Sequence, residues 1–107
     1  MATPEGNVKI PARNYAKDKG YIDIPLASPG NRSVPDDLLI GFGLVFAIEF
    51  KRPKGKPRKQ QAKRIRDLIS AGLPTYVFDN LQEFKSFIDK ITPTAPVEDD
   101  KVVRKKT

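Results

Sequence analysis

The stretch from Leu44 to Lys51, LVFAIEFK, limits the possible folds of this chain more than any other. An apolar run of this length is typical of a buried strand, but here it breaks at Glu49 and ends at Lys51. Residues two apart in a strand point to the same face of a sheet, so Glu49 and Lys51 share one face. The opposite face, which can enter a core, carries Phe46, Ile48 and Phe50.

The N-terminal half of the chain has the signals of one helix and three strands. Thr3-Pro4-Glu5 is a favourable helix start, Gly20 is a favourable stop, and Pro11 is expected to kink the helix or delay its start. Residues 21–25 alternate as a short strand, and residues 27–33 have the composition of a loop. The strands at 38–40 and 44–51, joined at Gly41-Phe42-Gly43, are expected to form an antiparallel hairpin.

The C-terminal half continues with a helix, a strand and a second helix. The apolar stripe within residues 58–71 predicts a helix that stops at Gly72, and residues 75–78 predict a strand. Asn80 caps a last amphipathic helix that extends to Ile91. The order αβββαβ(α) predicts a small α/β domain, residues 1–91, in which helices flank a mixed sheet. Residues 92–107 are expected to form a flexible charged tail.

The chain contains no cysteine and no histidine. This excludes disulfide frameworks, structural zinc sites, cysteine-based catalysis and any catalytic arrangement that needs a histidine base. A metal would have to be held by oxygen atoms, which suit Mg²⁺ or Mn²⁺ rather than zinc. No apolar run approaches the ~20 residues of a membrane-spanning helix, and no signal peptide is visible, so we expect a cytoplasmic protein.

The formal net charge of +7 favours a polyanionic partner, nucleic acid before an anionic membrane surface. The charge is concentrated, because residues 51–66 contain nine lysines and arginines and no acid. Many small domains are basic, so charge alone does not establish nucleic-acid binding.

Asp36 lies just before the second strand, and Glu49 lies near the end of the third. In an antiparallel hairpin these positions are neighbours, so Asp36 and Glu49 are expected to converge with Lys51 alongside. Two carboxylates could hold Mg²⁺ beside a phosphate, and the lysine could orient water or neutralise developing charge. Each short motif also has an ordinary structural explanation, as a turn or an ion pair at a strand end. Only their combination indicates catalysis.

The segment of residues 33–79, SVPDDLLIGFGLVFAIEFKRPKGKPRKQQAKRIRDLISAGLPTYVFD, resembles the VRR-NUC (virus-type replication-repair nuclease) family of the PD-(D/E)xK superfamily. The family pattern is a Val-Pro-Asp strand start, a Glu-x-Lys strand, a Gly-containing loop, a helix opening with Gln, a following Gly and a short strand. Its counterparts here are Val34 to Asp36, Glu49 to Lys51, Gly55, Gln61, Gly72 and Thr75 to Phe78. The resemblance implies a restriction-endonuclease-like core and extends in element order over residues 3–91.

The resemblance also implies roles for individual residues. Asp36 and Glu49 would be metal ligands with the backbone carbonyl of Phe50, Lys51 would be the catalytic lysine, and Gln61 would reach into the site. Glu5 matches a glutamate of the first helix that completes the site in the family.

Asp37 departs from the family pattern. It is either a surplus acid that faces away from the site or an alternative metal ligand. The register with Pro35 favours Asp36, rather than Asp37, as the metal ligand.

The basic residues around the predicted loop are expected to contact DNA phosphates; they are Arg52, Lys54, Lys56, Arg58 and Lys59. The expected activity is that of a Mg²⁺- or Mn²⁺-dependent endodeoxyribonuclease without a nucleotide cofactor. Standalone members of the family, typical of phages, imply a homodimeric Holliday (four-way) junction resolvase in the host cytoplasm. The alternatives are a nickase or flap nuclease of the same family, or a non-catalytic basic DNA-binding module.

Overall fold

A computed structural model describes residues 6–26, 34–52, 55 and 57–93 of the chain. Within these ranges a four-stranded sheet is combined with three helices in the predicted order. The elements are α1 (Gly6–Asp18), β1 (Ile22–Pro25), β2 (Asp37–Gly41), β3 (Leu44–Phe50), α2 (Lys59–Ser70), β4 (Thr75–Phe78) and α3 (Leu81–Ile91). The predicted start of the first helix at residues 3–5 lies outside the described residues, and so does the predicted tail of residues 92–107 from residue 94 onward.

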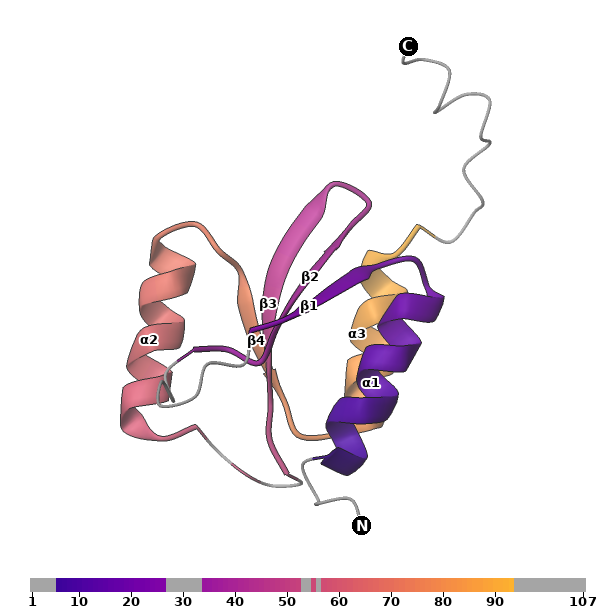
Figure 1. Cartoon of the computed structure of the whole chain (residues 1–107). Coiled ribbons are helices and arrows are strands. Elements are labelled where there is room, and N and C mark those ends of the chain that lie inside the picture. The colour runs from indigo at the N-terminus through magenta and orange to yellow at the C-terminus, as the bar shows by residue number, and fades with distance from the viewer. Residues whose placement is uncertain (1–5, 27–33, 53–54, 56, 94–107) are drawn as a thin grey trace.

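The sheet is mixed, with strand order β1-β2-β3-β4. β1, β2 and β3 form an antiparallel meander, and β4 joins β3 in parallel after the crossover through α2. Figure 1 shows α1 and α3 side by side on one face of the sheet and α2 alone on the other. The predicted fold class, a small mixed sheet flanked by helices, is therefore confirmed.

The core lies between the sheet and the α1–α3 layer, and α2 contributes no buried residue to it. Phe46, Ile48 and Phe50 of β3 enter this core, as their alternation predicts. The other residues of the buried cluster are Val8, Ala12, Ala16, Tyr21, Leu39, Phe84 and Ile88. Because Phe46, Ile48 and Phe50 face α1 and α3, the residues that alternate with them in β3, among them Glu49, face α2.

The β2–β3 hairpin closes through Phe42 and Gly43, which have φ angles of 54° and 80°. Positive φ at both central positions is typical of a type I′ turn, whose twist matches that of the flanking strands. A phenylalanine is unusual in this conformation, and its ring packs edge-on against Tyr21 at a centroid distance of 5.2 Å. The predicted turn is confirmed, and it fixes the register that brings Asp37 opposite Ile48.

Pro11 does not delay the start of the helix, because α1 begins at Gly6 and continues through this residue. At the sixth helical position the proline removes one backbone donor. Val8, Ala12 and Ala16 follow at four-residue spacing on one stripe and are all buried, and this packing holds the helix across the proline.

Candidate active site

Asp36 lies immediately before β2, next to the end of β3. Its Oδ2 accepts a hydrogen bond from the backbone N–H of Phe50 at 2.7 Å, and its Oδ1 lies 3.3 Å from Nζ of Lys9 on α1. Its backbone carbonyl also accepts a bond from the N–H of Leu26 at 2.7 Å. Continuing the β2–β3 register by one residue places Asp36 across from Glu49. The hairpin therefore brings the backbone positions of these two acids next to each other.

Glu49, Lys51 and Gln61 meet on the α2 side of the sheet. Nζ of Lys51 lies 2.9 Å from Oε2 of Glu49 and donates to Oε1 of Gln61 at 2.8 Å. The Gln61 amide nitrogen in turn donates to Oε2 of Glu49 at 3.3 Å. The three side chains therefore form a closed network, in which Glu49 is buried and Lys51 is only partly exposed.

Gln61 is positioned by the start of α2. Its Oε1 also accepts a bond from the backbone N–H of Arg58, the residue that caps this helix, at 3.2 Å. The Gln61 amide oxygen therefore accepts hydrogen bonds from a backbone N–H that has no partner within the helix and from the ammonium of Lys51. The Gln61 amide nitrogen faces the Glu49 carboxylate. Only this orientation of the amide gives each neighbour a compatible partner.

Asp37 faces the opposite side of the sheet from this network. Only 1 % of its surface is exposed, and Arg13 of α1 donates to both of its carboxylate oxygens at 2.8 Å. The structure supports the first of the two explanations for Asp37, that it is a surplus acid that faces away from the site. Asp36 precedes the strand and contacts Lys9 of the same helix and the N–H of Phe50, so the two neighbouring acids have different hydrogen-bond partners.

Arg13 also reaches the buried Asp23 of β1, with Nε 3.7 Å from Oδ2. Oδ1 of Asp23 is buried without a hydrogen-bond partner. Burial of this carboxyl, and then the neighbouring Asp37, raise the pKa of Asp23 to about 7, although Arg13 and Lys17 oppose the shift. The hydrogen bond and charge of Asp37 raise the pKa of Arg13 against its partial burial. This cluster ties α1 to the sheet directly behind the candidate active site.

The donor atoms of the site fit a hard divalent cation. Asp36 and Glu49 offer carboxylate oxygens, and Mg²⁺ needs only one or two such ligands because it retains several waters. The N–H of Phe50 points towards Asp36, and in an extended strand the carbonyl of the same residue points to the same edge. Within the described part of the chain no three acidic side chains gather into a metal-binding group, and Glu5, the third predicted carboxylate, lies outside it.

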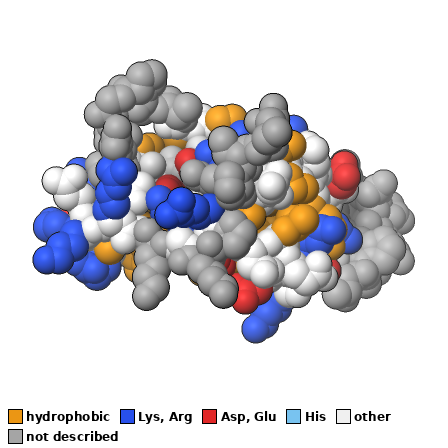
Figure 2. All heavy atoms as spheres, turned by 90° about the horizontal axis from the view of Figure 1, so that it is seen from below, with side chains coloured by type: hydrophobic (Ala, Val, Ile, Leu, Met, Phe, Trp, Pro, Cys, Tyr) orange, Lys and Arg blue, Asp and Glu red, His pale blue; other side chains and the backbone are white. Residues whose placement is uncertain are grey.

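The predicted DNA-binding residues are only partly described. Arg52, Arg58 and Lys59 are exposed around the end of β3 and the start of α2, beside the Lys51–Gln61 network. Lys54 and Lys56 lie outside the described residues. Figure 2 shows lysine and arginine side chains gathered on the side of the molecule where α2 lies.

Sequence reasoning missed two basic residues of α1, Lys9 and Arg13. They contact Asp36 and Asp37 respectively, so one face of α1 supplies a cation to each acid of the β2 start. The available signal was the spacing of Lys9, Arg13 and Lys17 at intervals of four, which forms one basic stripe along the helix.

The fold and this grouping of side chains define a small α/β domain with two carboxylates, a lysine and a glutamine at one end of a mixed sheet. The chain is similar in structure to a solved VRR_NUC domain, with a TM-score of 0.75 and 23 % sequence identity. The match covers 84 % of this chain and 99 % of that one, and it confirms the fold that the sequence resemblance implies. No protein-family model and no curated protein matches the chain. Among the described helices, none is long and apolar enough to cross a membrane.

Proposed function

We propose that this protein is a divalent-metal-dependent endonuclease that hydrolyses phosphodiester bonds of DNA. The observation that carries the proposal is the closed network of Glu49, Lys51 and Gln61, with Asp36 bonded to the backbone N–H of the intervening Phe50. A simple ion pair at a strand end would need neither Gln61 nor Asp36. The likeness of the fold to a VRR_NUC domain supports the same conclusion.

Asp36, Glu49 and the carbonyl of Phe50 would hold Mg²⁺ or Mn²⁺. When bound, such an ion lowers the pKa of a water ligand and stabilises charge that develops at phosphorus. Lys51 supplies a fixed ammonium donor for a phosphate oxygen, and this kind of preorganised donor stabilises a transition state. Gln61 keeps that ammonium in place through its 2.8 Å bond, and Arg52, Lys54, Lys56, Arg58 and Lys59 would hold the DNA backbone beside it.

The finer proposal is a homodimer that resolves four-way DNA junctions, since a two-fold axis would present two identical sites to two strands. Exposed apolar side chains on β1 and the β2–β3 hairpin support a second copy as the partner. They include Ile22, which is 61 % exposed, and Val45, which is 48 % exposed, and both lie in register with Ile40. Ile24, which is 40 % exposed, continues this face two residues along β1, and exposed apolar patches of this kind are typical of protein interfaces.

A comparison of substrates tests the proposal. A labelled four-way junction, a flap and a linear duplex would be incubated with the unaltered chain in Mg²⁺ or Mn²⁺, beside Asp36→Asn and Lys51→Ala. We expect cleavage of the junction by the unaltered chain alone and a dimeric mass in solution. Preferential cutting of flaps or nicking of duplex would favour the alternative nuclease activities. DNA binding without any cleavage would leave only a non-catalytic DNA-binding module.

A further inference from the structure

The charged residues of α2 are placed unfavourably for its helix dipole. The helix begins with Arg58 at the cap and Lys59, has no acid in its first turn and has no basic residue in its last. The N-terminal end of a helix carries partial positive charge, so basic residues there are unfavourable by ~0.3–1 kcal/mol each. An arrangement that is unfavourable for the free helix is favourable for an anion bound beside its first two turns.

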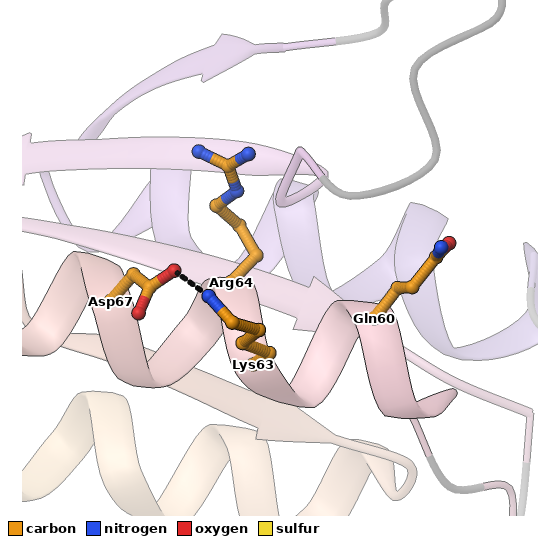
Figure 3. A pocket seen from close by; sticks show the side chains of 4 residues that line it. All are labelled: Gln60, Lys63, Arg64 and Asp67. Atoms are coloured by element: carbon orange, nitrogen blue, oxygen red, sulfur yellow. Dashed lines mark hydrogen bonds and ion pairs between the residues drawn. The ribbon is translucent and has the colours of Figure 1, made fainter.

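One side of α2 forms an open hollow that begins at Gln60. Gln60, Lys63, Arg64 and Asp67 line it, and Figure 3 shows these four side chains along one stripe of the helix. Gln60 is the neighbour of Gln61, and Lys63 and Arg64 follow about one turn, or ~5.4 Å, further along the axis. The stripe therefore leads away from the candidate active site by a step comparable with the spacing of phosphates in one strand.

The two cations of this hollow are available to a ligand. Nζ of Lys63 lies 3.2 Å from Oδ2 of Asp67, but the two side chains are 71 % and 53 % exposed. The base precedes the acid in this i,i+4 pair, which is the weaker orientation, so it is readily exchanged for a phosphate contact. Arg64 also lines a second, apolar hollow with Leu38, Leu68 and Leu73, and the aliphatic stem of an arginine packs on such a surface while its guanidinium stays in water.

We propose that Lys63 and Arg64, with Gln60, form a second binding site for the DNA backbone, which holds a phosphate beyond the one at the reacting centre. The proposal rests on DNA being the substrate, but it does not depend on cleavage. The site would bind the sugar-phosphate backbone along α2. It would contribute to the affinity for DNA and to the register of the DNA on the protein, but not to recognition of the base sequence.

The test measures DNA binding at several salt concentrations by fluorescence anisotropy, in an Asp36→Asn background that keeps the DNA intact. Arg64→Gln is compared with Arg66→Gln, a matched control with the same charge change on the same helix, outside the hollow. Loss of one phosphate contact lowers the slope of log K against log salt by ~0.9, and Lys63→Gln/Arg64→Gln should lower it by ~1.8. Arg66→Gln should leave the slope unchanged, Arg64→Lys should retain it, and Asp67→Asn should tighten binding.

Equal slopes for Arg64→Gln and Arg66→Gln would overturn the second site, because the helix would then act only through its total charge. An unchanged slope in the double variant would do the same. Either result could occur while the unaltered chain still cleaves DNA. The proposed nuclease activity would then be supported although the second site is not. Conversely, the expected slopes without any cleavage would support this site and contradict the nuclease.

Discussion

Asp36 and Asp37 are adjacent in the chain but should respond to substitution in opposite ways. Asp37 is buried and accepts two 2.8 Å bonds from Arg13. Removing one partner of a buried ion pair costs ~3–5 kcal/mol. Arg13 is partly exposed and keeps Asp23 as a neighbour, so we expect a cost at or just below the lower end of this range, about 2–3 kcal/mol, for Asp37→Asn. For a domain of this size, that loss lowers Tm by roughly 10–20 °C.

Asp36→Asn should instead affect activity and leave the fold intact. The ion pair of Asp36 with Lys9 is partly exposed and contributes at most ~1 kcal/mol, and an asparagine oxygen can still accept the bond from Phe50. Loss of a carboxylate metal ligand removes several kcal/mol of transition-state stabilisation, which corresponds to at least a ~100-fold loss of cleavage rate.

The assay pairs thermal unfolding, followed by circular dichroism, with single-turnover junction cleavage at a temperature well below the lowest Tm. Asp37→Asn should keep a rate within ~3-fold of the unaltered chain, a change of under 1 kcal/mol in the barrier. The reasoning fails if Asp36→Asn lowers Tm more than Asp37→Asn does. It also fails if Asp37→Asn abolishes cleavage while its Tm is unchanged.

Two further substitutions test the network and the cluster behind it. Gln61→Ala should slow cleavage by ~10–100-fold, as expected for a residue that positions a catalytic group, with DNA affinity nearly unchanged; a rate equal to that of the unaltered chain would contradict this role. Asp23→Asn should stabilise the fold increasingly as pH rises. The pKa of Asp23 is raised from 3.8 to about 7 on folding, so the folded state binds the extra proton and stability falls between these values, by at most ~1.4 kcal/mol per pH unit. The Tm difference between variant and unaltered chain should thus grow from pH 4 to 7 and then level off, and a constant difference would exclude a titrating Asp23.

The sequence predicted the order of elements and the side of the sheet on which Glu49 and Lys51 lie, because both follow from local patterns. Alternation in β3 separates core from site, and the turn at Phe42-Gly43 sets the register that brings Asp36 to the end of β3. The choice of Asp36 over Asp37 as the site residue is consistent with this register. Gln61 was predicted only through the family resemblance. The spacing of residues alone does not show that the start of α2 lies beside the end of β3.

The partners of Asp37 could not be predicted in the same way. Arg13 and Asp23 meet it only after α1 packs across β1 and β2, and no local pattern gives that docking angle. Pro11 is a similar case, since its local cost is offset by burial of Val8, Ala12 and Ala16 against the sheet. Tertiary packing decided both outcomes, and both concern the helix that stands behind the site.

The position of Arg13 links the stability of the fold to the geometry of the site. Its two bonds fix the first residue of β2, and Asp36 is the residue immediately before it. Because Asp36 is also held by the N–H of Phe50, its carboxylate is fixed from both its own chain and the neighbouring strand. Sites supported in this way by packed, hydrogen-bonded neighbours hold their reacting groups more accurately than sites on loops. The buried acids behind the sheet, although costly to the fold, therefore hold the start of β2, while the N–H of Phe50 holds the Asp36 carboxylate itself and would still do so in Asp37→Asn.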